Sequence, residues 1–170
     1  MQMHRLSDGV LVQQARRGSL TAAGQLFERH WPAAWRAAYA ITGRRDVAED
    51  VAQDGFERAF GALERFDPHR PFAPWLHRIV ANRALDYARA RALRRTAAEG
   101  EPAAQDPVPL DDALVTALGA LSLEHRAVVV LRYLLDYTPG EIATMLELPR
   151  GTINSRLRRA LDALAEVVER

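Results

Sequence analysis

Apolar residues recur at three- and four-residue spacing along both halves of the chain, and an alternating strand pattern is not sustained. The periodicity therefore predicts an all-α protein. In the first half, Ser19 is a candidate N-cap, and Pro32 suits the first turn of a new helix. The helices predicted there span about residues 6–17, 20–30, 32–42, 46–65 and 72–95. Four more are predicted from about Leu110 onward.

A segment of different composition separates the two helical blocks. Residues 97–109 contain three Pro, one Gly and a single large apolar residue, Val108. Such a segment buries too little surface to offset its ordering entropy, so we interpret it as a flexible, acidic linker. We expect two small helical domains, residues 1–96 and 110–170, of which the second contains a helix-turn-helix.

Composition and charge sharpen this division. The chain has 170 residues, of which 48% are hydrophobic, enough for a packed core. Its net charge is only +1, but residues 1–96 hold 16 Arg against 10 acidic residues, whereas residues 97–125 hold six acidic residues and no Arg. All 23 basic residues are Arg. Two Arg-bearing blocks therefore flank an acidic connector.

The residue inventory disfavours several function classes. Cys is absent, which excludes disulfides, thiolate metal sites and a Cys nucleophile. The five His are scattered, and no Glu-x-x-His pair occurs, so neither a metal nor a cofactor is predicted. Without a nucleophile–base pair or a Gly-rich phosphate loop, no enzymatic activity is expected. No apolar run reaches the roughly 18 residues of a membrane span, and the N-terminus lacks a signal-peptide pattern. A cytoplasmic protein without membrane insertion is expected.

The C-terminal block carries the start signals of two short consecutive helices. Thr138, Pro139 and Glu141 fit a capping box, and Pro149 favours a break followed by a fresh start. The second helix leaves a polar face formed by Arg150, Asn154, Ser155, Arg158 and Arg159. Arg and Asn side chains can read guanine and adenine in the major groove, so this pattern indicates a DNA-binding helix-turn-helix. An ordinary helical hairpin with a solvated Arg face is the alternative.

The N-terminal block contains an unusually acidic predicted helix. Asp46, Asp50 and Asp54 are four residues apart and share one face, where like charges repel. Such a face suggests a docking surface for a basic protein partner. The helix dipole offers an alternative account of Asp46, Glu49 and Asp50, but not of Asp54 or of Glu57, which lie far from the predicted N-terminus.

Aromatic and Arg side chains alternate across residues 65–83, a combination suited to stacking on unpaired bases and to neutralising phosphates. Trp75 and Ile79 lie at helical spacing and are expected in the core. Phe66, His69 and Asn82 are the better candidates for contact with DNA.

Taken in order, residues 46–56, 72–82, 140–143 and 151–157 resemble the motifs of bacterial sigma factors of the extracytoplasmic-function (ECF) class. This resemblance implies two helical domains that dock on core RNA polymerase and recognise the minus-ten and minus-thirty-five promoter elements. It also implies that the acidic helix binds the clamp helices of the largest polymerase subunit. The loop 66–71 would capture a base flipped out of the minus-ten element. Unstacking that base from the duplex costs a few kcal/mol, which the loop would have to offset.

The resemblance assigns roles to individual residues. Core polymerase binding falls on Asp46, Glu49, Asp50, Gln53, Asp54 and Glu57. Minus-ten DNA binding falls on Phe66, Asp67, His69, Arg70, Arg78, Asn82 and Arg83. Minus-thirty-five DNA binding falls on Arg132, Arg150, Thr152, Asn154, Ser155, Arg158 and Arg159. An anti-sigma factor is a further expected partner.

The sequence leaves one other function open. A stand-alone transcriptional regulator would use the same helix-turn-helix, with the N-terminal block sensing a ligand or forming a dimer. Such a protein would bind a palindromic duplex without polymerase.

Overall fold

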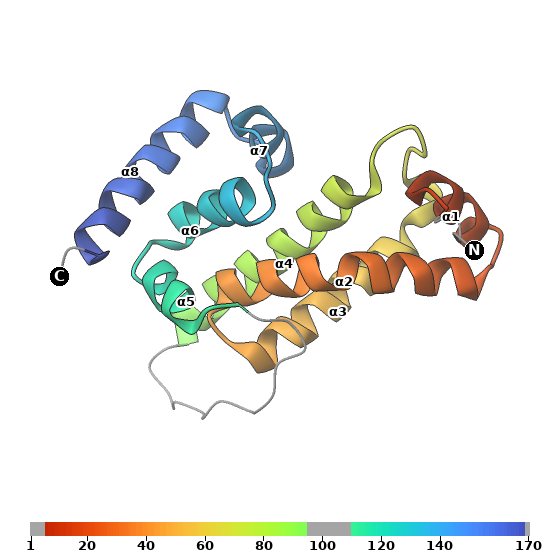
Figure 1. The fold of residues 1–170 in the computed structure, drawn as a ribbon, viewed down its shortest axis with the longest axis horizontal. Coiled ribbons are helices and arrows are strands. Elements are labelled where there is room, and N and C mark those ends of the chain that lie inside the picture. The colour runs from red at the N-terminus through yellow and green to blue at the C-terminus, as the bar shows by residue number, and fades with distance from the viewer. Residues whose placement is uncertain (1–5, 95–109, 169–170) are drawn as a thin grey trace, which may run out of the picture.

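The structure is a computed structural model that describes residues 6–94 and 110–168, and all regular elements in these ranges are helical. The prediction of an all-α protein is therefore confirmed. Helices α1–α4 form an N-terminal unit and α5–α8 a C-terminal unit (Figure 1). The N-terminal helices are α1 (Asp8–Arg16), α2 (Leu20–Thr42), α3 (Arg45–Gly61) and α4 (Phe72–Arg94), with a 3-10 turn η1 (Leu63–Arg65). The C-terminal helices are α5 (Asp112–Gly119), α6 (Leu123–Val129), α7 (Pro139–Leu146) and α8 (Arg150–Val168), with a π-helical turn η2 (Val130–Leu134).

Local capping signals account for most helix boundaries. The Ser19 side chain accepts a hydrogen bond from the Ala22 amide at 3.2 Å and starts α2, as predicted. Gly43 ends the same helix at a φ of 70°, a conformation that glycine adopts without a steric penalty. In the C-terminal unit, Ser122 caps α6 in the same way as Ser19 caps α2.

The predicted break at Pro32 is wrong, because α2 runs without interruption from Leu20 to Thr42. Proline inside a helix costs about 3 kcal/mol or more through its missing amide and its steric clash. Leu26 before the proline is completely buried, and Trp35 after it is 2% exposed. Burying two such large side chains contributes about as much as the proline costs, so packing against α3 and α4 holds the helix together.

The N-terminal unit is built on close packing of α2, α3 and α4. Gly55 of α3 faces Val80 of α4, and a Cβ atom placed on Gly55 would lie 2.5 Å from Val80 Cγ2. The absence of a side chain at Gly55 therefore permits the close approach of these two helices. Phe56, the next residue, fills the core against Phe27 with ring centroids 4.7 Å apart.

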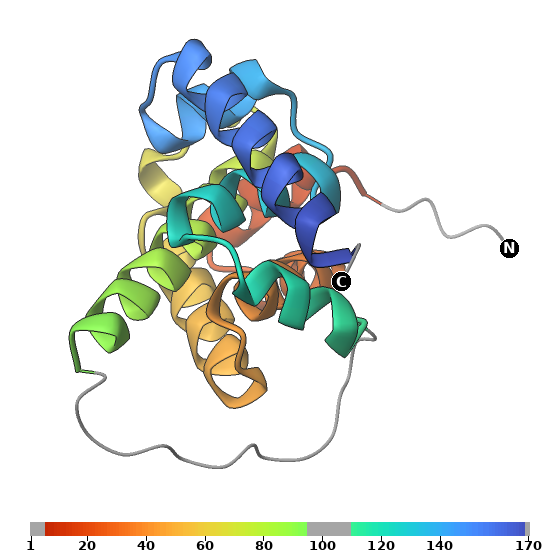
Figure 2. The same cartoon turned by 90° about the vertical axis from the view of Figure 1, so that its left-hand side faces the viewer.

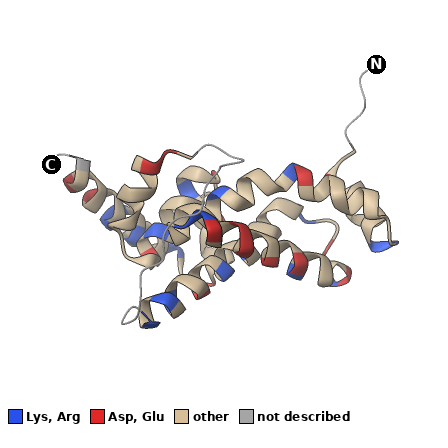
Figure 3. Ribbon diagram, turned by 90° about the horizontal axis from the view of Figure 1, so that it is seen from below, with Lys and Arg blue, Asp and Glu red and all other residues tan. Residues whose placement is uncertain are grey.

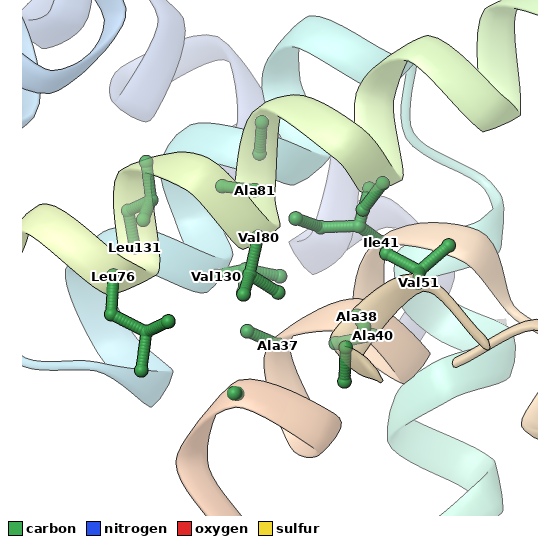
Figure 4. Packing of buried hydrophobic residues seen from close by; sticks show 14 of the residues in the cluster. Ala37, Ala38, Ala40, Ile41, Val51, Leu76, Val80, Ala81, Val130 and Leu131 are labelled. Carbon is green, nitrogen blue, oxygen red and sulfur yellow. The ribbon is translucent and has the colours of Figure 1, made fainter. Parts of the chain in front are cut away.

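The two units pack against each other and share one apolar core. Helix α6 lies between α8 on one side and α2 and α4 on the other, as the two views in Figures 1 and 2 show. Figure 4 shows Val80 of α4 in the same cluster as Val130 of the C-terminal unit. The sequence predicts two modules but not this contact, because nothing local encodes it. The predicted linker, residues 97–109, lies outside the described residues.

Candidate nucleic-acid interface

Acidic residues follow one another along α3, as Figure 3 shows from below. Glu49, Asp50 and Glu57 are exposed, and no ion pair joins any of them to the rest of residues 6–94 and 110–168. Gln53 is exposed beside them. Four of the six residues assigned to polymerase binding therefore form an open polar face on α3.

The other two acidic residues of this set already have partners within the chain. Arg44 binds Asp46, and these hydrogen bonds hold the pKa of Asp46 below its usual range. Burial would raise the pKa of Asp54, but hydrogen bonds from Arg83 and Arg58 outweigh it and lower that pKa. The repulsion expected along this acidic face is therefore offset at Asp46 and Asp54 by Arg side chains of the same unit.

The loop before α4 is ordered by side-chain contacts with its backbone. Nε of Arg16 donates to the carbonyl of Leu63 at 2.8 Å, and the same guanidinium also donates to the carbonyl of Phe66. Asp67 accepts from the His69 amide at 3.0 Å. The side chains of Asp67, His69 and Arg70 remain exposed at the surface.

Phe66 does not lie where a base could stack on it. Its side chain is only 5% exposed, and its ring packs 4.7 Å from Trp75 and 5.9 Å from Phe72. The prediction that Phe66 contacts DNA is therefore wrong for this conformation, because the loop folds the ring into the core. Trp75 and Ile79 pack against the core, as expected.

Three residues assigned to minus-ten DNA follow along α4. Asn82 is exposed, whereas Arg83 is half-buried and bound to Asp54. Arg78 is bound to Glu147, a residue of the C-terminal unit. In this arrangement, Asn82 is the only one of the three without an ion pair or hydrogen bond to another described residue.

The C-terminal unit contains the predicted helix-turn-helix. Thr138 caps α7, its hydroxyl accepting from the Glu141 amide at 3.3 Å, while the Glu141 carboxylate accepts from the Thr138 amide at 2.7 Å. Glu147 ends α7 in the left-handed region, at a φ of 55°. The chain then turns at Pro149 and starts α8 at Arg150.

The outer face of α8 carries most of the residues assigned to minus-thirty-five DNA. Arg150, Asn154, Arg158 and Arg159 are exposed, whereas Ile153, Leu157 and Ala160 on the opposite face are buried. Thr152 and Ser155 are half-buried, and the Ser155 hydroxyl donates to the Thr152 carbonyl at 3.0 Å. This division into a buried and an open polar face is the one that major-groove insertion requires.

Arg132 lies on η2 and differs from the α8 residues in its surroundings. Its side chain is half-buried, with Nη1 3.5 Å from the Tyr137 carbonyl and the guanidinium carbon 5.4 Å from the centroid of the Tyr133 ring. The Tyr133 ring is exposed beside it.

Four residues that join the two units were not singled out from the sequence. Nδ1 of His77 lies 2.6 Å from the Tyr137 hydroxyl, and both side chains are buried. Arg126 donates to the Ile41 carbonyl at 2.7 Å across the same boundary. His77 sits on the apolar side of its helix beside Leu76, and this is the only sequence signal for its burial.

Neither a metal site nor a membrane span is found within residues 6–94 and 110–168. These ranges hold no group of three or more His, Asp or Glu side chains arranged to bind a metal ion. None of their helices is long and apolar enough to cross a membrane.

The chain matches two protein families in the order of its two units. Residues 26–94 match Sigma-70 region 2, and residues 111–164 match Sigma-70 region 4. It is 33% identical to the RNA polymerase sigma factor CnrH of Cupriavidus metallidurans, over 96% of this chain and 95% of that protein. It is 35% identical to the ECF RNA polymerase sigma factor SigL of Mycobacterium tuberculosis, over 82% of this chain and 84% of that protein.

Solved structures agree with the sequence matches. The structure of CnrH in complex with the cytosolic domain of CnrY superposes with a TM-score of 0.74 at 32% identity, covering 95% of this chain and 97% of that one. The sigma factor RpoE of Bartonella quintana, solved with the anti-sigma factor NepR, has the same fold, with a TM-score of 0.73 at 24% identity over 86% and 96% of the two chains.

Two helical units that match Sigma-70 region 2 and Sigma-70 region 4, in this order along the chain, define a sigma factor. The chain belongs to the sigma-70 family, within its ECF class. The hypothesis of a stand-alone regulator is not favoured, because both units match sigma regions and the relatives cover nearly the whole chain.

Proposed function

We propose that this sigma factor binds core RNA polymerase through the exposed polar face of α3 and reads promoter DNA through α4 and α8. The observation that carries the proposal is the division of α8 into a buried apolar face and an open face bearing Arg150, Asn154 and Arg158. Arg and Asn are the side chains best suited to bidentate contact with guanine and adenine. As in the rest of its family, the function is to direct transcription initiation from particular promoters.

Glu49, Asp50, Gln53 and Glu57 are the proposed contacts of α3 with polymerase. All four side chains are exposed, which supports this assignment. Within the described part of the chain, no ion pair neutralises Glu49, Asp50 or Glu57. Free carboxylates steer a basic partner and fix its register more than they add affinity. Asp46 and Asp54 are proposed to contribute less, because Arg44, Arg58 and Arg83 already bind them.

For the minus-ten element we propose the exposed loop residues Asp67, His69 and Arg70 together with Asn82 of α4. All four side chains reach the surface, and the loop is held in place by the Arg16 contacts. Such an ordered loop can receive an unstacked base without a large entropic cost. Arg78 and Arg83 are proposed to contact DNA phosphates only after leaving their present partners.

For the minus-thirty-five element we propose Arg150, Asn154, Arg158 and Arg159 as the residues that reach base edges or phosphates. Thr152 and Ser155 are proposed as shorter polar contacts near the start of α8. Arg132 is proposed to reach the DNA backbone from η2, its side chain already oriented by Tyr133 and Tyr137.

The proposal assigns the chain no catalytic activity of its own, since a specificity subunit supplies recognition while polymerase performs synthesis. It places the protein in the cytoplasm, where transcription takes place. An anti-sigma factor is a further proposed partner, supported by the structure of the relative CnrH bound to the cytosolic domain of another protein, CnrY.

A charge reversal on α3 tests the proposal. Asp50→Arg should weaken binding to core polymerase by at least tenfold in a titration with fluorescently labelled protein, because it places a cation where a carboxylate docks. Glu28→Arg, an equivalent reversal at an exposed position of α2, is the matched control and should bind as the wild type does. Equal binding by both variants and the wild type would show that α3 is not the docking surface.

A further inference from the structure

Helix α1 lies beside the loop that joins η1 to α4, and no residue assigned to polymerase or DNA binding is on it (Figure 1). The stretch that matches Sigma-70 region 2 begins at residue 26, so α1 precedes it. A Cβ atom placed on Gly9, near the start of α1, would lie 3.9 Å from the carbonyl oxygen of Pro68 in the loop. Arg16, at the other end of α1, contacts the segment from which the loop starts. The loop therefore has α1 along one side.

The Arg16 side chain binds three backbone carbonyls of this segment. Nε donates to the carbonyl of Leu63 at 2.8 Å, and Nη2 donates to the carbonyl of Glu64 at 3.3 Å. Nη2 also donates to the carbonyl of Phe66, the first residue of the loop. The planar guanidinium has five N–H donors in a fixed fork, so one side chain can hold several acceptors in a set geometry. A lysine ammonium, which is a compact point charge, cannot reproduce this geometry.

Arg16 projects from a helix that is itself held firmly. The Asp8 carboxylate at the start of α1 accepts from Arg29 of α2 at 2.6 Å and lies 2.8 Å from Nε2 of His30. Leu11, in the middle of α1, is completely buried. A side chain can fix a loop only if its own backbone is fixed, and α1 meets this condition.

The hydrogen bonds inside the loop do not attach it to the rest of the molecule. The Asp67 carbonyl accepts from the Arg70 amide at 3.0 Å, and the Asp67 carboxylate accepts from the His69 amide at 3.0 Å. These bonds shape the turn. The buried ring of Phe66 anchors the start of the loop, and Arg16 fixes the carbonyl of the same residue. Together they set the direction in which the chain leaves the core, and hence where the exposed side chains of the loop lie.

Resting on the proposed function, we propose that Arg16 is a positioning residue for minus-ten recognition, which holds the loop 66–71 in the geometry that receives the unstacked base. Arg16 acts through the loop, since its guanidinium is bound to backbone carbonyls and not to DNA. A loop that is fixed in advance loses less conformational entropy when the base enters. More of the contact energy is then left to offset unstacking.

Amide hydrogen exchange, measured by NMR in the free, full-length chain, tests the role of Arg16 in the loop without polymerase or DNA. Arg16→Ala should accelerate exchange of the Phe66 and Arg70 amides by about tenfold, because hydrogen bonds from a charged group are lost. The Ile142 amide in α7 should exchange as in the wild type. Arg17→Ala removes an equal charge from the next residue, which is exposed, and should change none of these rates.

The consequence for promoter DNA is measured in the polymerase holoenzyme. On promoters defined by run-off transcription, the permanganate reactivity of unpaired thymines reports opening of the minus-ten element. Arg16→Ala should lower this reactivity by about fivefold or more, while its binding to core polymerase stays that of the wild type. Arg16→Lys keeps the charge but not the fork, so it should open promoters as poorly as Arg16→Ala. Arg17→Ala should open them normally.

Circular dichroism shows whether each variant is folded, and Arg16→Lys carries the comparison if Arg16→Ala is not. Three results would overturn the positioning role. The first is unchanged exchange of the loop amides in the Arg16 variants, and the second is full promoter opening by a variant whose loop exchanges faster. The third is an equal loss of binding to core polymerase, which would make Arg16 a residue of general stability.

Failure of the proposed function gives a different result. A wild-type protein that directs no transcripts would contradict the proposed function and, with it, any role of Arg16 in minus-ten recognition. The exchange rates of the free chain would still show whether Arg16 fixes the loop. Normal transcription by the wild type, combined with normal promoter opening by both Arg16 variants, would contradict the positioning role alone.

Discussion

The Tyr137 hydroxyl of the C-terminal unit lies 2.6 Å from Nδ1 of His77 in α4, inside the boundary between the two units. His77 is 6% exposed and is the one polar or charged residue of the described ranges that is fully buried. Burial, with a smaller contribution from His30, lowers the pKa of His77 from 6.5 to about 4. The imidazole is therefore neutral at physiological pH, and Tyr137 can donate to it.

This buried histidine predicts a pH-dependent stability. Below pH 6.5 the unfolded chain takes up a proton at His77 that the folded protein does not, so stability is full above that pH and falls towards pH 4. Between pH 7 and pH 5 the free energy of unfolding should drop by about 2 kcal/mol from this group. Urea unfolding at several pH values measures the drop.

The variant His77→Phe should flatten this dependence, since phenylalanine has no proton to gain. His69→Gln replaces an exposed histidine and is the control, which should keep the wild-type slope. Identical slopes for His77→Phe and the wild type would mean that His77 is accessible to solvent in the folded protein.

The close approach of Gly55 and Val80 predicts that even a single methyl group added at position 55 lowers the stability of the protein. Gly55→Ala gains up to about 1 kcal/mol of helix propensity, but its Cβ would meet Val80 Cγ2 at 2.5 Å. Valine in a helix has one favoured rotamer and cannot easily move aside, so overpacking of about 1–3 kcal/mol should prevail. Thermal unfolding should show a lower midpoint.

Gly24→Ala is the matched control, because nothing lies within 4 Å of a Cβ built there. It should raise stability by up to about 1 kcal/mol. Adding Val80→Ala to Gly55→Ala should recover part of the packing loss, and a Gly55→Ala protein as stable as Gly24→Ala would refute the proposed close approach.

Thermal unfolding should also measure how much the capping box of α7 contributes to stability. Thr138→Ala removes the oxygen that accepts from the Glu141 amide and should cost about 1 kcal/mol. Thr138→Ser retains the oxygen and should be nearly neutral. Thr144→Ala, at an exposed threonine of the same helix, controls for the loss of a side chain. Equal unfolding midpoints for all three variants would contradict the role of the cap.

Because the polar face of α8 is open, we predict that removing one of its Arg side chains weakens promoter recognition. Arg158→Ala should weaken binding of the polymerase holoenzyme to its promoter by about 1–3 kcal/mol if Arg158 reads a base, with relaxed specificity at that position. Arg17→Ala removes an equal charge from the end of α1, far from α8 (Figure 1), and should bind as the wild type does. A uniform loss across all sequences, with a smaller salt dependence, would assign Arg158 to a phosphate instead.

Local signals in the sequence predicted the fold well. The Ser19 cap, the Thr138 capping box and the polar face of α8 were all found where the pattern placed them, because each depends on residues within a few positions of one another. The break predicted at Pro32 failed, since packing of Leu26 and Trp35 with other helices outweighs the local preference.

Contacts between residues far apart in the chain could not be predicted from the sequence. Phe66 lies in a segment whose aromatic and Arg side chains suit the stacking of bases, but packing against Trp75 and Phe72 buries its ring. Asp54 belongs to a repulsive acidic row until Arg83, 29 residues away, is brought beside it. The pairing of His77 with Tyr137 joins residues 60 positions apart, and no spacing rule connects them.

Run-off transcription tests the central claim most directly. The assay mixes this protein with core polymerase and genomic DNA fragments, both from the source organism. It should give defined transcripts that core polymerase alone does not produce. Asp50→Arg and Arg158→Ala should both reduce them, the first by impairing polymerase binding and the second by impairing promoter choice. If the wild-type protein yields no transcripts beyond those of core polymerase, the assignment as a promoter-specificity subunit is contradicted.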